Sequence, residues 1–139
     1  MKIGFIGLGN VGSKLAGSLC RNGFELFVRD LNKGNAKPLI KQGAVWGHSP
    51  REIAEQVDIV ITCLPNPAVS ATVMESDDGI LLGLTEGKIW AEMSTTDEGE
   101  VRRLGQRVID KGAAPMDCPV SGGCHRAVTG NISIFVGSE

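Results

Sequence analysis

Three glycines near the N-terminus have the spacing of a binding site for a diphosphate. Gly7, Gly9 and Gly12 lie between a short apolar run, 3–6, and a segment with helical periodicity. The N-terminus of a helix presents free backbone N–H groups and a partial positive charge, and both favour a bound anion. The first glycine permits the tight turn, the second leaves room for phosphates, and the third lets the helix pack on the strand. This pattern predicts a site for the diphosphate of a dinucleotide.

An acidic residue follows the second predicted strand, residues 25–29. Asp30 comes about 20 residues after the glycine turn, where a carboxylate can accept hydrogen bonds from the adenosine ribose. A negative charge there would repel the 2′-phosphate of NADP, so the sequence favours NAD. Arg29 keeps NADP possible, because its guanidinium could turn toward a phosphate. Asp30 could instead be a turn or N-cap residue before a helix expected from Asn32.

Three further loops carry groups that could contact a dinucleotide or a small acid. Leu64-Pro65 ends an apolar strand and would form a rigid apolar wall. Ser94-Thr95 offers hydroxyls where a nicotinamide ring would lie, although it could also cap the next helix. Ser121-Gly122-Gly123 combines a hydroxyl with unhindered backbone N–H groups, which suits a small carboxylate; a plain flexible turn is the alternative.

The elements that must position these loops alternate between strands and helices. That alternation is typical of βαβ units, so we expect an α/β fold of Rossmann type, with a doubly wound, mostly parallel sheet in one domain over 1–139. In such sheets, ligands bind at the carboxyl ends of the strands. The expected strands are 3–6, 25–29, 44–46, 57–64, 88–93, 113–119 and 132–136; the expected helices are one after Gly9, then 32–42, one opening at Pro50, 69–74 and 97–111; and 120–130 is expected to be a glycine-rich loop.

The composition is that of an ordinary globular domain. The 139 residues are 42% hydrophobic and 22% charged, and the net charge of −2 offers no basic surface for nucleic acid. No apolar run is long enough to cross a bilayer, and the N-terminus does not resemble a signal peptide, so we expect a cytoplasmic location. The four cysteines form no C-x-x-C pair, and the spacing of Cys118, Cys124 and His125 matches no standard zinc site. No metal is expected.

Several motifs in this order resemble the β-hydroxyacid dehydrogenase family, which includes 3-hydroxyisobutyrate dehydrogenase and tartronate semialdehyde reductase. The resemblance covers the whole chain and implies that the chain is the N-terminal NAD-binding domain of this family. The matching stretches are 5–12 (FIGLGNVG), 63–67 (CLPNP), 93–95 (MST), 117–123 (DCPVSGG) and 130–137 (GNISIFVG).

The resemblance also implies a role for each matching residue. The pyrophosphate would be bound by Gly7, Leu8, Gly9, Asn10, Val11 and Gly12, and the ribose by Asp30. The remaining coenzyme contacts would come from Leu64, Pro65 and Val69, with Thr95 near the nicotinamide. The substrate carboxylate would be held by Ser121, Gly122 and Gly123.

The family's catalytic lysine belongs to a glycine-rich stretch on a helix beyond the nucleotide domain, and this sequence contains no such stretch. We therefore expect the chain to be the coenzyme-binding part of a larger homo-oligomeric enzyme whose helical second domain is absent here. The whole enzyme would transfer hydride between a small β-hydroxy acid, similar to 3-hydroxyisobutyrate, and NAD. Residues 1–139 alone would have little or no activity.

Three alternatives stay open at this point. An NADPH-dependent glyoxylate or semialdehyde reductase of the same family usually carries Arg-Thr after the second strand, where this chain has Leu31-Asn32. Decarboxylating 6-phosphogluconate dehydrogenase differs at the glycine turn and at the end of the second strand. A non-catalytic nucleotide-binding module could use the fold without chemistry.

Overall fold

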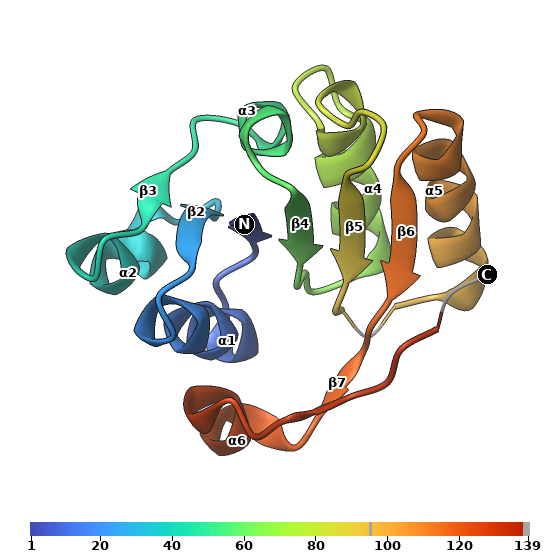
Figure 1. The fold of residues 1–139 in the computed structure, drawn as a ribbon. Helices are drawn as coiled ribbons and strands as arrows, with labels where there is room; N and C mark the ends of the chain where they lie inside the picture. The colour runs from blue at the N-terminus through green and yellow to red at the C-terminus, as the bar shows by residue number, and fades with distance from the viewer. Residues whose placement is uncertain (95, 138–139) are drawn as a thin grey trace.

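The computed structural model describes residues 1–94 and 96–137. Its centre is a sheet of six parallel strands, and a separate two-stranded antiparallel sheet follows (Figure 1). The strands are β1 (Lys2–Ile6), β2 (Glu25–Arg29), β3 (Val45–Trp46), β4 (Ile59–Thr62), β5 (Ile89–Glu92), β6 (Ala114–Asp117), β7 (Val120–Ser121) and β8 (Ser133–Ile134). The helices are α1 (Asn10–Arg21), α2 (Lys37–Lys41), α3 (Pro50–Gln56), α4 (Pro67–Glu75), α5 (Glu98–Asp110) and α6 (Gly123–Thr129), with 3₁₀ turns η1 (Lys33–Ala36) and η2 (Ile80–Leu82). The expected doubly wound α/β fold is confirmed.

The strand order of the main sheet is β3-β2-β1-β4-β5-β6, so the direction of winding reverses at β1. Gly4 of β1 pairs with Phe27 of β2 on one side and with Val60 of β4 on the other. A crevice for ligands is expected at such a reversal, outside the carboxyl ends of β1 and β4. In Figure 1 the arrowheads of β4, β5 and β6 point down toward this edge, and β7 and α6 lie below it.

Alternate strand residues face two separate cores. Phe5 is fully buried on the side that carries α1 and α2, together with Leu15 and Leu39. The neighbouring Ile6 faces the opposite side, where Trp90 is fully buried with residues of α3, α4 and α5. Because both faces of the sheet are covered, the strands read as nearly continuous apolar runs.

Most expected elements are present, with adjusted ends. The expected helix 32–42 is divided into η1 and α2, with Pro38 in the first turn of α2, where its missing N–H is tolerated. The expected strand 57–64 is shorter, because Val57 still caps α3. Asn66 accepts a hydrogen bond from the Val69 N–H at 2.9 Å, so α4 begins earlier than expected, at Pro67.

The expectation of a glycine-rich loop over 120–130 was wrong. These residues contain β7 and then α6, which is closed by Gly130 in the left-handed conformation, φ +74°. Ala127 is fully buried in the core on the α1 side of the sheet, and the Arg21 guanidinium of α1 donates to the Val128 carbonyl. Packing against α1 therefore supplies the stability that a short glycine-containing helix lacks by itself.

The last expected strand, 132–136, was also too long. Only β8 is formed, and it pairs antiparallel with β7 through Ser121 and Ser133 rather than joining the main sheet. Beyond it, Gly137 forms an antiparallel bridge with Asp117 at the end of β6. The glycines at 122 and 123, both with positive φ, allow the chain to leave β7 and enter α6.

Candidate functional site

The glycine turn between β1 and α1 has two closed positions and one open position. A Cβ on Gly7 would lie 2.1 Å from the Cys63 carbonyl oxygen, and φ there is +101°, so only glycine fits. A Cβ on Gly12 would lie 2.0 Å from the Gly7 carbonyl oxygen. A Cβ on Gly9 would meet nothing within 4 Å. The turn is therefore packed on its inner side, with open space in front of Gly9.

The outer residues of the turn expose backbone N–H groups rather than side chains that could bind a ligand. Leu8 is only 2% exposed, so its side chain belongs to the core, whereas Gly9 and Asn10 are exposed. Gly9 occupies the N-cap position of α1 without a side-chain cap, and no acidic residue lies in the first turn. The free N–H groups and the positive end of this twelve-residue helix thus face the open space in front of Gly9.

Asp30, at the end of β2, reaches back to this turn. Its Oδ1 accepts a hydrogen bond from the Leu8 N–H at 3.1 Å. Its Oδ2 accepts from the Asn32 N–H at 3.1 Å and from the Asn35 Nδ2 at 2.8 Å. A carboxylate oxygen can accept about two hydrogen bonds, so Oδ1 keeps one acceptor position beside the turn.

Arg29 does not face the glycine turn. Its Nη1 donates to the Gly47 carbonyl at 3.0 Å, and its guanidinium lies 5.4 Å from the centre of the Trp46 ring. Both contacts hold the charge over β3, and both would have to break before Arg29 reached a phosphate.

The loop after β4 lies directly beside the turn. The Leu64 Cδ2 is 3.0 Å from the place that a Cβ of Gly7 would occupy, and the Leu64 N–H donates to the Ser94 Oγ at 2.6 Å. Pro65 is exposed and Val69 half-buried in the first turn of α4. The structure therefore brings the segment 64–69 and Ser94 to the same edge as the glycines.

The predicted nicotinamide contact, Thr95, lies outside the described residues. Ser94 before it is 3% exposed, and its N–H donates to Glu92 Oε1 at 3.0 Å. The hydroxyl of Thr96 is buried and has no hydrogen-bond partner within the described part of the chain. Such an atom is uncommon in a folded protein.

The predicted carboxylate-binding residues lie at the start of α6. Ser121 and Gly123 are exposed, and Gly122, with φ +129°, occupies the N-cap position. They lie beyond the carboxyl ends of the main strands (Figure 1), and α6 docks on α1 at its other end, where Gly130 approaches Ser18. The structure thus brings this segment to the same side of the molecule as the glycine turn.

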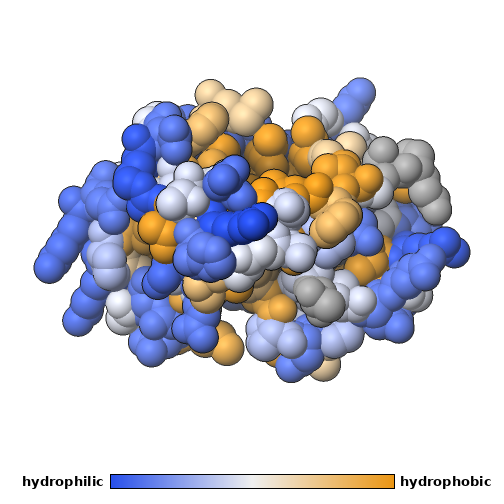
Figure 2. Space-filling model, turned by 90° about the horizontal axis from the view of Figure 1, so that it is seen from below, coloured by the Kyte–Doolittle hydropathy of each residue, from blue (hydrophilic) through white to orange (hydrophobic). Residues whose placement is uncertain are grey.

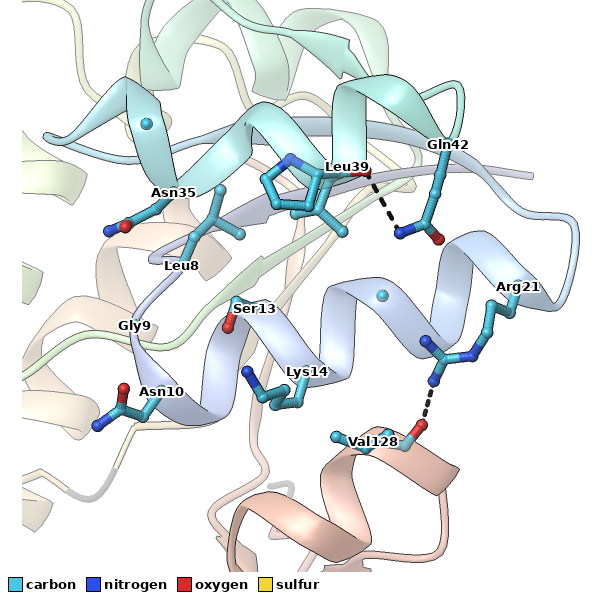
Figure 3. Close-up of a pocket in the computed structure, with 13 residues that line it drawn as sticks. Leu8, Gly9, Asn10, Ser13, Lys14, Arg21, Asn35, Leu39, Gln42 and Val128 are labelled. Carbon is cyan, nitrogen blue, oxygen red and sulfur yellow. Dashed lines mark hydrogen bonds between the residues drawn. The ribbon is translucent and has the colours of Figure 1, made fainter.

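A cavity of about 520 Å³ opens beside the glycine turn (Figure 3). It runs from Gly9 and Asn10 along α1, between that helix and the residues Gly34 and Asn35 of η1. Leu64, Pro65, Val69 and 121–123 do not line it. The cavity therefore follows α1 away from the turn; it includes Asn35, which binds Asp30, but Asp30 itself does not line it. Viewed from this edge, apolar side chains form a patch in the upper half of the molecule, while strongly hydrophilic ones lie at its centre and on its left and right flanks (Figure 2).

Several polar residues at this edge were not predicted as functional. Thr62, Ser70 and Glu92 are buried together, and Asn35 binds the Asp30 carboxylate. Glu92 had a detectable signal, because it is an acid inside an otherwise apolar strand, IWAE. Asn35 had no such signal in the sequence, since its position relative to Asp30 depends on the 3₁₀ turn η1.

Neither a cluster of metal ligands nor a membrane-spanning helix is present in the described ranges, 1–94 and 96–137. No three His, Cys, Asp or Glu side chains there are grouped so that they could hold a metal ion. None of the helices that the structure describes combines the length and apolar character needed to span a bilayer.

The family model described as the NAD binding domain of 6-phosphogluconate dehydrogenase matches residues 2–139. The chain belongs to this family of NAD-binding domains. The match spans nearly every residue, including the glycine turn, Asp30 and the segment 121–123. The predicted coenzyme domain is confirmed by this match.

Curated relatives of this NAD-binding domain carry dehydrogenase names. The chain is 36% identical over 135 residues to mitochondrial 3-hydroxyisobutyrate dehydrogenase of Mus musculus, covering 97% of this chain and 40% of that protein. It is 33% identical over 139 residues to 2-(hydroxymethyl)glutarate dehydrogenase of Eubacterium barkeri, covering 100% of this chain and 46% of that protein. The chain thus spans less than half the length of these two relatives.

Solved structures show the same arrangement. A 3-hydroxyisobutyrate dehydrogenase of Mycobacterium tuberculosis, solved with L-serine, superposes with a TM-score of 0.92 at 25% identity, over 99% of this chain and 46% of that one. Psf3, solved with NADP⁺ and 2-OPP, gives a TM-score of 0.94 at 28% identity, over 99% of this chain and 49% of that one. The resemblance to the 3-hydroxyisobutyrate dehydrogenases is therefore confirmed in sequence and in fold.

Proposed function

We propose that this NAD-binding domain serves an NAD-dependent dehydrogenase of small β-hydroxy acids similar to 3-hydroxyisobutyrate. The observation that carries the proposal is the Asp30 carboxylate, which accepts from Leu8 N–H at 3.1 Å within the glycine turn. A carboxylate that is hydrogen-bonded to the diphosphate-binding turn is placed to accept hydrogen bonds from the ribose hydroxyls.

The turn fits the coenzyme that the family binds. The open space in front of Gly9 admits a diphosphate, while Gly7 and Gly12 have no room for a side chain. The exposed N–H groups of α1 supply donors and a partial positive charge without any cation. When bound, the coenzyme would accept or supply the hydride; the chain's part is to hold and orient it.

NAD is the proposed coenzyme in preference to NADP. The Asp30 carboxylate would repel a 2′-phosphate, and Leu31, where the NADPH-dependent reductases usually carry arginine, is 97% exposed and offers no charge. The rival proposal, an NADPH-dependent reductase, draws support from Psf3, which was solved with NADP⁺. Arg29 does not strengthen the rival, because its guanidinium is engaged over Trp46.

Substrate binding would combine this chain with the rest of the protein. The Ser121 hydroxyl and the N–H groups of Gly122 and Gly123 are proposed to hold the substrate carboxylate, since all three lie beyond the carboxyl ends of the strands. A lysine outside residues 1–139 is proposed to move the proton on the hydroxyl oxygen, and the same second domain to form a homo-oligomer. Positioning of this kind supplies several kcal/mol of the barrier reduction in known enzymes.

We also propose a cytoplasmic location. We propose no nucleic-acid partner, because the net charge of −2 offers no basic surface. The related 3-hydroxyisobutyrate dehydrogenases of Mus musculus, Rattus norvegicus and Homo sapiens are named mitochondrial.

A non-catalytic nucleotide-binding module is the remaining alternative. The residue of the whole protein that aligns with the family's lysine would distinguish this module from the proposed enzyme. Lysine there supports the enzyme, and any residue unable to exchange a proton supports the module.

Calorimetric titration of the chain with NAD and with NADP tests the coenzyme proposal. We expect saturable binding of NAD and at least about tenfold weaker binding of NADP. Tighter binding of NADP would overturn the role given to Asp30 and favour the reductase. Binding of neither would overturn the proposed function.

A further inference from the structure

A buried carboxylate lies at the end of β5, in contact with Ser94. Glu92, the last residue of β5, is 0% exposed. Its Oε1 lies 3.0 Å from the Thr62 hydroxyl and 3.0 Å from the Ser94 N–H, and its Oε2 lies 3.1 Å from the Ser70 hydroxyl. Three elements therefore meet at one side chain: the ends of β4 and β5 and the first part of α4.

The direction of these hydrogen bonds follows from their donors. The Trp90 Nε1–H can only donate, and it donates to the Thr62 Oγ1 at 2.9 Å. The Thr62 hydroxyl hydrogen is then directed at the Glu92 Oε1, which also accepts from the Ser94 N–H. Both oxygens of the carboxyl group are thus engaged, and its position between β4 and α4 is fixed.

The network continues to the edge of the site. The Ser94 N–H donates to Glu92, and the Ser94 Oγ accepts a hydrogen bond from the Leu64 N–H at 2.6 Å. Leu64 is the residue whose side chain approaches Gly7, and the Met93 N–H donates to the Thr62 carbonyl at 2.8 Å. The Leu64 backbone and Ser94 are therefore tied to each other and to Glu92.

Burying this carboxyl group is costly. Among the described residues, its hydrogen-bond partners are hydroxyls and one backbone N–H, and no lysine or arginine pairs with it. A well-packed apolar side chain of similar volume would often be as stable or more stable at a buried charged position. What an apolar side chain cannot do is hold the Ser94 N–H and the two hydroxyls in one arrangement.

We infer that Glu92 is a positioning residue for the nicotinamide ring of the coenzyme. It fixes Leu64 and Ser94, on the two loops that follow β4 and β5, and leaves the ribose and diphosphate contacts at Asp30 and Gly9 untouched. This inference rests on the proposed function, because it concerns the same coenzyme site.

The test compares NAD with ADP-ribose, which keeps the adenosine, both phosphates and the second ribose and lacks only the nicotinamide ring. Dissociation constants of both are measured by calorimetry on the full chain, and the ratio of the ADP-ribose constant to the NAD constant reports the nicotinamide ring alone. We expect a ratio above one in the wild type. In Glu92→Leu the ratio should fall to about one, with the ADP-ribose constant changed by less than about twofold.

Two variants separate positioning from general damage. Glu92→Gln keeps an oxygen for the Thr62 hydroxyl and the Ser94 N–H, and its amide can donate to the Ser70 hydroxyl, so the ratio should stay near the wild-type value. Ser70→Ala removes a contact of the same carboxyl group on the side away from Leu64, so the ratio should again be retained. If Glu92→Leu shows no cooperative thermal transition, Ser94→Ala replaces it, because it removes only the acceptor of the Leu64 N–H.

Each other result overturns the inference. The first such result is a wild-type ratio of one. The second is found in Glu92→Leu, or in its replacement Ser94→Ala: either both ligands bind equally more weakly, or the ratio is unchanged. The third is a ratio that falls to one in Glu92→Gln or Ser70→Ala. In all of these the wild type still binds ADP-ribose, and the proposed function survives. A wild-type chain that binds neither ligand overturns the proposed function and the inference together.

Discussion

The Asp30 carboxylate accepts a hydrogen bond from the backbone N–H of Leu8 at 3.1 Å, although 22 residues separate them in the chain. The contact joins the carboxyl end of β2 to that of β1, which are neighbours in the sheet. It holds the acid beside the N-terminus of α1. A ribose bound to Asp30 would consequently place its attached diphosphate in front of Gly9.

The first prediction concerns the charge of Asp30. Asp30→Asn should weaken NAD binding by about tenfold, because the ribose hydroxyls lose a charged acceptor, and should weaken NADP binding less, because the repulsion of the 2′-phosphate is relieved. Calorimetric titration with both coenzymes measures the change. Asn35→Ala is the control, since it removes a competing donor from Asp30 Oδ2 and should not weaken NAD. An unchanged NAD/NADP preference in Asp30→Asn would contradict the prediction.

The second prediction contrasts two glycines of one turn. Gly9→Ala should leave the thermal midpoint within about 2 °C of the wild type, because its Cβ meets nothing within 4 Å, yet should weaken NAD by tenfold or more, on the order of 1.4 kcal/mol, because that Cβ enters the phosphate space. Gly7→Ala should instead destabilise the fold by about 3 kcal/mol or more, since its Cβ would lie 2.1 Å from the Cys63 carbonyl at φ +101°.

Circular dichroism melts and NAD titrations of both glycine variants check this contrast. Gly23→Ala is a useful comparison, because it shares the positive φ of Gly7, +82°, but has open space around its Cβ. Its cost should therefore be that of backbone strain alone, about 1 kcal/mol. Full NAD affinity in Gly9→Ala would place the diphosphate elsewhere.

The third prediction concerns the Cys63 thiol. Burial, and after it the negative charge of Glu92, raise its pKa from 9.0 to about 11. At pH 8 the reactive thiolate fraction should therefore be about a hundredfold lower than for a thiol of pKa 9.0. Alkylation by iodoacetamide, followed at the Cys63 peptide by mass spectrometry, should be slow at pH 8 and accelerate as the pH approaches 11. Rapid labelling at pH 8 in the folded protein would contradict the raised pKa of this half-buried thiol.

The fourth prediction concerns acid stability. Hydrogen bonds from Arg103 and Arg107 lower the pKa of Glu75 from 4.5 to about 2. A carboxyl group with a lowered folded pKa adds stability above its unfolded pKa and loses it as the pH falls through the folded pKa. The contribution should therefore be complete above about pH 5 and disappear between pH 4.5 and 2.

Melting curves of Glu75→Gln and wild type across pH 2 to 7 measure this effect. At pH 7 the variant should melt about 2 °C lower, a small difference because the arginines are about half exposed and screened by solvent. The gap should close toward pH 2 and shrink at high salt. A gap that persists unchanged at pH 2 would show that Glu75 acts through packing rather than charge.

The sequence by itself determined the parallel α/β architecture, the glycine turn and the acid after the second strand. These features depend on short-range rules: apolar runs for strands covered on both faces, glycine where the backbone turns or packs closely, and polar N-caps. Gly7, Gly12 and Asp30 were recognisable because such requirements act over a few residues. The family resemblance extended the same local signals to Leu64 and to 121–123.

Only the tertiary structure decided how distant residues meet. Residues 120–130 form β7 and α6, and the burial of Ala127 against α1 stabilises this helix. The glycine content of the segment gives no indication of that packing. Asn35 reached Asp30 through a 3₁₀ turn, and Glu92 joined Thr62, Ser70 and Ser94 only because β4, β5 and α4 are packed together. A buried polar group takes its partners from whichever elements surround it, so its role follows from the packing of the whole domain.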